Sequence, residues 1–171
     1  MSETIVRERT LAWDAPEATA QAIVGRDPLV WMREMMEGKI PAPPAARLMD
    51  FGMESVELGK VVFSMKTHEW MANPVGVIHG GMAATLLDTV MTLAVTSKLP
   101  PEKMCTTLDL HIRFLRPLFP TGEKVIGEGV AVHVGATFGS AEGRLYNAVG
   151  KLVATGTASL AIIDAAAVRP R

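Results

Sequence analysis

The segment from residue 82 to residue 95 constrains the fold most, because its hydrophobic side chains point in almost every direction around a helical axis. They are Met82, Ala83, Ala84, Leu86, Leu87, Val90, Met91, Leu93, Ala94 and Val95. A helix that is apolar on all sides is normally buried. This helix has roughly 17 residues with one aspartate and several threonines among them, whereas a membrane span needs about 20 apolar residues. We therefore expect a fold built around one buried helix.

Four strand-like runs follow this helix, separated by turns that contain Gly, Pro or Asn. They cover residues 104–115, 123–134, 137–147 and 151–163. In the first run a polar set alternates with an apolar set: Thr107, Asp109, His111 and Arg113 against Leu108, Leu110, Ile112 and Phe114. This period of two predicts a strand with one buried face.

Small residues share one face of the last two runs. They are Gly139, Ala141 and Gly143 in the third run, and Ala154, Gly156 and Ala158 in the fourth. Small side chains on adjacent strands allow a bulky structural element to pack close to the sheet, and the apolar helix is the only candidate. The sequence therefore predicts an α+β fold in which an antiparallel sheet curls around one long helix.

Residues 1–45 are predicted to form a helical extension. Asp27 followed by Pro28 is typical of an N-cap and a first helical position, and prolines at positions 41, 43 and 44 end the helical pattern. The helix after Pro28 either lies across the domain as part of its core or forms a flap over a substrate channel. Its methionines would give such a flap a pliable apolar wall.

The remaining residues divide into a domain and a tail. We assign residues 46–163 to one domain, which opens with a hairpin formed by residues 46–54 and 59–66. Residues 164–171 are expected to form a short tail. A single domain of this size is ordinary for a chain of 171 residues.

Charge and composition exclude several classes of function. The chain has 17 basic and 18 acidic residues, so it lacks the basic excess of a protein that grips nucleic acid by its phosphates. Cys105 is the only cysteine, which rules out an internal disulfide. The first ten residues are polar and lack the apolar core of a signal peptide. We expect a cytoplasmic protein with no membrane or nucleic-acid partner.

Asp88 is the strongest functional signal, because it lies in the middle of the most apolar segment. A carboxylate in such a place costs free energy unless it is hydrogen-bonded or has a function. Asp88 is therefore either a structural carboxylate, bonded to Thr85, Thr92 or a backbone amide, or a catalytic group.

The second signal is His79-Gly80-Gly81, where the apolar helix begins. A helix N-terminus offers free amides and a partial positive charge, and two glycines let a ligand approach the backbone. These are the components of an oxyanion hole, although a plain loop-to-helix turn would need the same flexible residues. No His, Asp or Glu lies at metal-ligand spacing from His79, so no metal site is predicted.

The two signals are separated along the helix. Gly81 and Asp88 lie on nearly one face, but about 10 Å apart along the axis at the usual rise per residue. A second copy of the helix running antiparallel would bring the N-terminus of one chain to Asp88 of the other, and a two-fold dimer does this twice. If these residues form one site, that site lies between subunits.

Three stretches of this sequence carry a resemblance to a known family. They are Asn73-Pro74-x-Gly76-Val77-Ile78-His79-Gly80-Gly81 with Asp88 nine residues after the histidine, residues 107–117 ending in Phe114-Leu115-Arg116-Pro117, and Gly150-Lys151-Leu152-Val153-Ala154. Together they resemble the hotdog-fold thioesterases of the PaaI-like, or phenylacetate-degradation, branch over about residues 46–163. The resemblance implies a hotdog fold, a homodimer or a dimer of dimers, and hydrolysis of acyl-CoA thioesters to acid and CoA. It implies no cofactor beyond the CoA of the substrate.

The resemblance also implies roles for particular residues. Asp88 would act as general base or as nucleophile. The amide of Gly80, or that of Gly81, would polarise the thioester carbonyl, and His79 would orient this turn. Asn73 would position the nucleophile or the water.

The remaining implied contacts lie on the first strand after the helix. Thr107 falls where the family often has Ser or Thr beside the carboxylate, with Thr106 as the alternative if the loop length differs. Arg113 and Arg116 would meet the CoA phosphates or remain solvated charges on the strand. The basic residue that many relatives carry after Gly135 is absent here.

The sequence leaves other functions open. A non-catalytic acyl-CoA- or lipid-binding module and a hotdog dehydratase or hydratase would have the same fold. The spacing of Asn73, His79 and Asp88 disfavours the dehydratase. The long N-terminal extension would cap the acyl pocket and set its chain-length preference, but the sequence does not identify the acyl group.

Overall fold

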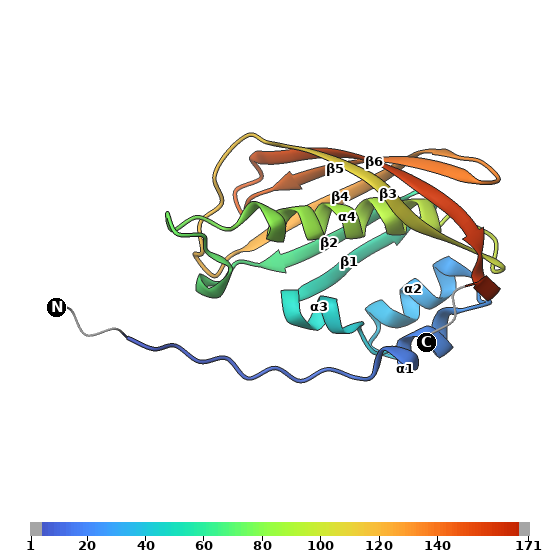
Figure 1. Ribbon diagram of the computed structural model, residues 1–171, viewed down its shortest axis with the longest axis horizontal. Coiled ribbons are helices and arrows are strands. Elements are labelled where there is room, and N and C mark those ends of the chain that lie inside the picture. The colour runs from blue at the N-terminus through green and yellow to red at the C-terminus, as the bar shows by residue number, and fades with distance from the viewer. Residues whose placement is uncertain (1–4, 168–171) are drawn as a thin grey trace.

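A computed structural model describes residues 5–167 of the chain (Figure 1). The elements, in order, are α1 (Pro16–Ile23), α2 (Pro28–Met36), α3 (Pro44–Met49), β1 (Phe51–Glu57), β2 (Lys60–Lys66), the 3-10 turn η1 (Glu69–Met71), α4 (Gly80–Thr96), β3 (Lys103–Phe114), β4 (Lys124–Val134), β5 (Phe138–Tyr146), β6 (Leu152–Asp164) and the 3-10 turn η2 (Ala165–Ala167). The strands form one antiparallel sheet in the order β1-β2-β4-β5-β6-β3. The sheet curves around α4, which confirms the predicted α+β architecture.

Small residues let α4 lie close against the sheet, as predicted. A Cβ atom added to Gly143 would stand 3.0 Å from a methyl carbon of Leu87, and one added to Gly156 would stand 3.3 Å from the methyl carbon of Met91. The closest approach was not predicted. It is at Gly129 of β4, where an added Cβ would overlap the backbone of Val90. The contact between helix and sheet therefore depends on glycine at this position.

The alternation predicted along β3 is interrupted by a β-bulge. Thr107 pairs with Leu160 and Asp109 with Ser159, so Leu108 has no partner and is 63% exposed. The prediction that Leu108 faces the core is wrong, because the extra residue reverses the phase of the strand. The reversal turns Thr107 toward α4, while the side chains of Leu110 and Ile112 still pack on the core.

The helix α4 is buried only on the side that the sheet covers. Its fully buried side chains are Leu86, Leu87, Val90, Met91, Ala94 and Val95. On the opposite side Gly81 and Thr85 are exposed, and Asp88, Thr89 and Thr92 are half-buried. The prediction of burial on all sides is therefore wrong for a single chain, in which one polar stripe of α4 stays open.

The N-terminal extension contains two helices where one was expected, and a third crosses its predicted end. The predicted cap is confirmed, since an Asp27 carboxylate oxygen accepts a hydrogen bond from the Val30 N–H (3.1 Å). Residues 46–49 belong to α3, so the strand predicted there is wrong. Pro44 suits the first turn of a helix, and Asp50, in the left-handed region (φ 54°), ends it.

These three helices form one layer along the outer strand of the sheet. Both α2 and α3 contact β1, and α1 contacts α2 (Figure 1). At the other end of the chain, Asp164 closes β6 opposite Lys103, one residue later than predicted. The last part of the predicted tail, residues 168–171, lies outside the described residues.

Candidate active site

The loop before α4 is folded by its own side chains into a rigid turn. The side-chain oxygen of Asn73 accepts hydrogen bonds from the backbone N–H groups of Val75 (3.1 Å) and Val77 (3.3 Å). The backbone N–H of His79 donates to the carbonyl of Met71 (2.8 Å). These bonds deliver the chain to the first turn of α4 in one fixed direction.

His79 caps α4 through its imidazole. Its Nδ1 accepts a hydrogen bond from the Gly81 N–H at 2.9 Å, which fixes Nδ1 as the unprotonated nitrogen in the neutral ring. The described residues provide no hydrogen-bond acceptor for the Gly80 N–H. Of the two amides considered from the sequence, that of Gly81 is used by His79 and that of Gly80 is free for a ligand.

A cleft of about 370 Å³ lies beside the free amide. It is lined by Asn73 and Gly80, by the segment after β3 that includes Arg116, and by apolar side chains of β5 and β6. The ring of Phe114 lies against Gly80, where an added Cβ would be 3.1 Å from the ring. Sequence reasoning gave Phe114 no role beyond its place in the motif, because its proximity to Gly80 follows from the sheet and not from local spacing.

The Asp88 carboxylate lies on the open stripe of α4, half-buried. One of its oxygens, Oδ1, accepts a hydrogen bond from the Thr107 hydroxyl at 2.7 Å, and Thr107 Oγ1 lies 3.2 Å from Thr92 Oγ1. The second oxygen has no partner among residues 5–167. Asp88 is thus oriented through one oxygen and keeps the other available to a ligand or a water.

The contact with Asp88 distinguishes the two candidate threonines of β3. Thr107 faces α4 because of the bulge at Leu108, whereas Thr106 is exposed. The structure therefore brings Thr107, and not Thr106, to the carboxylate.

The two arginines of the sequence motif lie in different places. Arg116 lines the cleft beside Gly80, and its guanidinium donates to the carbonyl of Leu152 (2.5 Å). Arg113 lies in a shallow depression between β3, β5 and β6, with His111 and Arg144. Only Arg116 is near the free amide.

Cys105 lies on β3 and faces Thr96, which is two turns of α4 after Asp88. Its Sγ is 3.2 Å from the Thr96 hydroxyl. Burial raises the pKa of the Cys105 thiol, and the hydrogen bond with Thr96 opposes this rise only in part. The thiol is therefore neutral at pH 7, and a neutral thiol is a poor nucleophile.

Neither a metal-binding cluster nor a helix able to span a membrane is found among residues 5–167. No three His, Cys, Asp or Glu side chains there come together to hold a metal ion. Within the same range no helix has the length and hydropathy to cross a membrane.

Gly81 and Asp88 remain separated within one chain. They lie on the same helix about 10 Å apart along its axis, so a carbonyl at the helix N-terminus does not reach the carboxylate of the same chain. Both groups face outward on the open stripe of α4. The structure therefore holds a free amide at Gly80 and an oriented carboxylate at Asp88 apart from each other within one chain.

Comparisons with known proteins point to one family. The profile of the Thioesterase superfamily matches residues 75–154. Acyl-coenzyme A thioesterase 13 of Homo sapiens is 30% identical over 129 residues, which cover 73% of this chain and 89% of that protein. A phenylacetic acid degradation-related protein of Ralstonia eutropha JMP134 has 31% identity and a TM-score of 0.69, covering 75% of this chain and 97% of that one.

A second similar structure contains a ligand. A Streptococcus mutans UA159 protein bound to acetyl-CoA has 26% identity and a TM-score of 0.62, covering 67% of this chain and 89% of that one. The resemblance found in the sequence is confirmed by these matches, and the curved sheet around α4 is the hotdog fold.

Proposed function

The chain belongs to the thioesterase superfamily, and we propose that it hydrolyses acyl-CoA thioesters to free acid and CoA. One observation supports this most: α4 carries a free amide at Gly80, its first residue, and a carboxylate oriented by Thr107 on its open stripe. Acyl transfer needs both groups, an oxyanion donor and a base or nucleophile. The similar protein that is bound to acetyl-CoA agrees with the substrate class.

We infer that the working unit is a homodimer. Two α4 helices packed antiparallel through their open stripes would place the N-terminus of one against the partner subunit's Asp88. Each two-fold dimer would hold two such sites. The dimer would also cover Gly81 and Thr92 of the stripe, which are exposed and half-buried in a single chain.

In this site the thioester carbonyl accepts a hydrogen bond from the Gly80 N–H. Asp88 then takes a proton from a water whose oxygen adds to the carbonyl carbon, or adds to that carbon itself to form a mixed anhydride that water hydrolyses. In both routes the carbonyl oxygen becomes negative in the tetrahedral intermediate. The Gly80 amide and the partial positive charge of α4 stabilise it, and its collapse expels the CoA thiolate.

Other residues hold this arrangement in place. Thr107 orients the carboxylate, and His79 fixes the first turn of the helix by occupying the Gly81 N–H. Asn73 uses its oxygen in the turn and lines the cleft, so its amide NH₂ is left to position the water. Arg116 would meet a CoA phosphate at the rim of the cleft. We assign weaker substrate contacts to the exposed residues Thr106 and Arg113.

Release of the CoA thiol tests the proposal. We expect Asp88→Asn to lower kcat by at least about two orders of magnitude, because the amide neither accepts the proton nor attacks the carbonyl. Asp109→Asn is the matched control, since Asp109 is an exposed carboxylate on the same strand as Thr107. Absence of turnover by a folded, dimeric wild-type protein on short, long and aryl acyl-CoAs would favour the non-catalytic binding module.

A single turnover in ¹⁸O water detects the nucleophilic route when water attacks the anhydride at the protein carboxyl. If Asp88 acts as nucleophile, hydrolysis of the anhydride at the protein carboxyl transfers ¹⁸O to Asp88, which mass spectrometry of the peptide detects. If Asp88 acts as general base, ¹⁸O enters only the product acid.

A further inference from the structure

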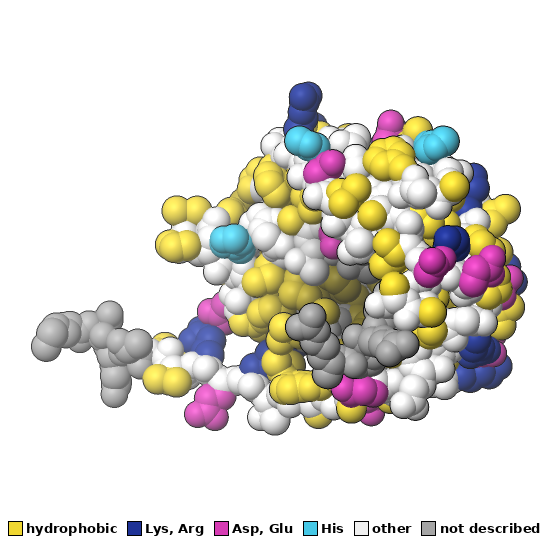
Figure 2. All heavy atoms as spheres, turned by 45° about the vertical axis from the view of Figure 1, so that its right-hand side comes forward, with side chains coloured by type: hydrophobic (Ala, Val, Ile, Leu, Met, Phe, Trp, Pro, Cys, Tyr) yellow, Lys and Arg dark blue, Asp and Glu magenta, His cyan; other side chains and the backbone are white. Residues whose placement is uncertain are grey.

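An apolar chamber of about 420 Å³ lies between the N-terminal helices and one side of α4. Its walls come from α1, α2, α3, β1, β2 and α4, and most of its lining is hydrophobic. The largest lining side chains are Trp31, Met35, Met36, Phe51, Phe63 and Leu93. On the side of the molecule that carries α1 and α2, hydrophobic side chains gather around a recess (Figure 2).

The polar residues of the chamber wall do not offer free hydroxyl groups. Thr85 and Thr89 of α4 donate their hydroxyls to the carbonyls of Gly81 (2.9 Å) and Thr85 (2.8 Å). The Thr19 hydroxyl donates to the carbonyl of Pro41 (3.0 Å). The wall therefore has no unused side-chain hydroxyl for a polar guest, and an apolar guest loses least on entry.

The chamber borders the proposed catalytic carboxylate. Thr85 and Thr89, which line it, lie one turn before and one residue after Asp88 on α4. A thioester whose carbonyl stands at Asp88 can therefore extend its acyl chain along α4 into the chamber of the same subunit. This step rests on the proposed function.

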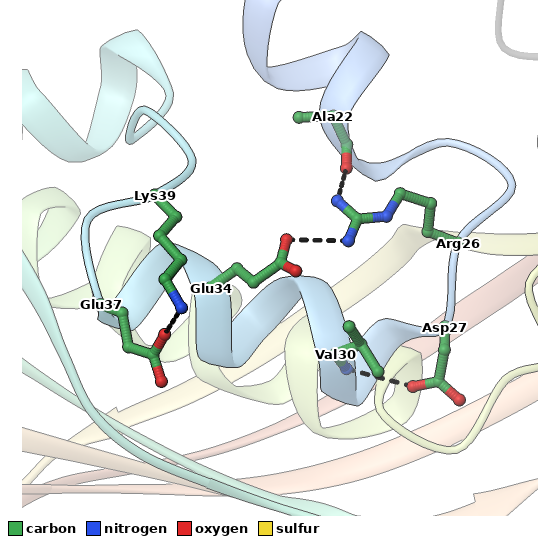
Figure 3. A network of polar contacts seen from close by, with 7 residues as sticks. All are labelled: Ala22, Arg26, Asp27, Val30, Glu34, Glu37 and Lys39. Atoms are coloured by element: carbon green, nitrogen blue, oxygen red, sulfur yellow. Dashed lines mark hydrogen bonds and ion pairs between the residues drawn. The ribbon is translucent and has the colours of Figure 1, made fainter.

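A polar network holds the roof of the chamber together (Figure 3). Arg26, between α1 and α2, donates to the carbonyl of Ala22 (2.8 Å) and to the Glu34 carboxylate (2.8 Å). Both helices lie outside residues 75–154, which the superfamily profile matches.

We propose that this chamber selects straight, saturated acyl chains of about 10 to 15 carbons, with α1, α2 and α3 acting as its roof. The volume sets an upper limit of about 17 carbons, because an apolar cavity of about 150 Å³ holds one benzene molecule of six carbons. An alkyl carbon with its two hydrogens takes more room than an aromatic carbon, which lowers the number that fits. An acetyl group would leave the chamber empty, and a single aryl ring would fill only about a third of it. The two flexible methionines, Met35 and Met36, adapt the wall to an alkyl chain.

The test is the dependence of kcat/KM on chain length, measured with saturated acyl-CoAs from two to eighteen carbons. Each methylene that enters the chamber raises kcat/KM by up to about fourfold, until the chamber is full and the rise stops. Ala46→Phe adds a benzene-sized ring to the roof at α3, so we expect the rise to stop about six carbons earlier.

Two further variants control the experiment. Leu48→Phe places the same phenyl ring on the same helix at an exposed position outside the chamber, and we expect the wild-type profile. Met35→Ala widens the chamber, so the rise in kcat/KM should continue to longer acyl chains. This variant tests the inference if Ala46→Phe does not fold. A profile that is flat in the wild-type protein, or that Ala46→Phe and Met35→Ala leave unchanged, would overturn the inference while hydrolysis itself stands.

Binding separates failure of the inference from failure of the proposed function. If the wild-type protein hydrolyses no thioester, affinities for the same acyl-CoAs are measured by calorimetry. Emission of Trp31, which lines the chamber, is followed in parallel, with Trp13 and Trp70 replaced by Phe. An affinity that rises with chain length, and that stops rising at a shorter chain in Ala46→Phe, supports binding of the acyl chain in the chamber even in the absence of catalysis. Affinity independent of chain length contradicts it.

Discussion

The Gly80 amide can be removed without removing the helix. Gly80 is the first residue of α4, a position that suits proline because its N–H has no partner within the helix. His79 has φ −59° and ψ 133°, which is the extended conformation required before proline. We therefore expect Gly80→Pro to fold and to lack only the proposed oxyanion donor.

Alanine at the same position is the matched control. Both residues add a Cβ that meets the ring of Phe114 at about 3.1 Å, and this ring is 56% exposed and can move aside. Only Gly80→Ala keeps the N–H. The difference between the two variants therefore isolates the hydrogen bond from the crowding.

The expected magnitude follows from the role of the amide. Loss of one oxyanion-hole donor lowers kcat by about 10² to 10³, or about 2.7–4 kcal/mol of transition-state stabilisation. We expect that loss in Gly80→Pro, with a much smaller change in KM, because the bond strengthens as charge develops on the carbonyl oxygen. Gly80→Ala should stay within about tenfold of the wild-type kcat, since it pays only for local repacking.

The assay is CoA thiol release under saturating substrate, with circular dichroism and size-exclusion chromatography to verify fold and assembly. Equal kcat values for Gly80→Pro and Gly80→Ala in folded protein would refute the reasoning. The carbonyl would then be polarised by another group, such as the side chain of Asn73 in the same cleft.

Three further predictions concern the support of the site and the core. Thr107→Val removes the hydrogen bond to Asp88 and should lower kcat by about 10- to 100-fold. Thr106→Val is the control and should leave kcat within about twofold of the wild-type value. Similar losses of kcat in both variants would contradict the contact between Thr107 and Asp88. Gly129→Ala drives a methyl group into the backbone of Val90 and should lower the free energy of unfolding, measured in urea, by at least about 3 kcal/mol. A decrease of less than about 1 kcal/mol would contradict the close packing of α4 on β4. Since burial raises the pKa of the Cys105 thiol, a thiol reagent should modify it more slowly than free cysteine at pH 8 and at the ordinary rate in urea. The free energy of unfolding should also fall as pH rises above the thiol's ordinary range, because the unfolded chain loses this proton first, and fast modification of the folded protein would contradict the burial.

Local patterns in the sequence predicted the elements that local interactions define. The cap at Asp27 and the four strands after α4 follow from short-range chemistry, and the structure contains them within about a residue or two of the predicted bounds. The turn from Asn73 to Gly81 also closes on itself. The sequence could therefore identify these candidate residues, although their catalytic roles stay predictions.

The features that the sequence did not predict depend on contacts between distant segments. The bulge at Leu108 is set by the register of β3 against β6, and it decides that Thr107 and not Thr106 meets Asp88. The packing of Phe114 on Gly80 likewise follows from where the sheet edge lies beside α4. A strand is predicted at residues 46–49 because these residues directly precede a strand, but they belong to α3, which begins at Pro44.

Complementation between two inactive variants tests the central claim most directly, namely that each site is shared between subunits. Asp88→Asn and Gly80→Pro are co-expressed with different tags, and the mixed dimer is purified through both. If the site is shared, one of its two sites combines an intact Gly80 amide with an intact carboxylate of the other subunit, so the mixed dimer should regain about half of the wild-type activity. If each site lies within one chain, both sites of the mixed dimer are defective, and activity no higher than that of the two parent variants would contradict the account.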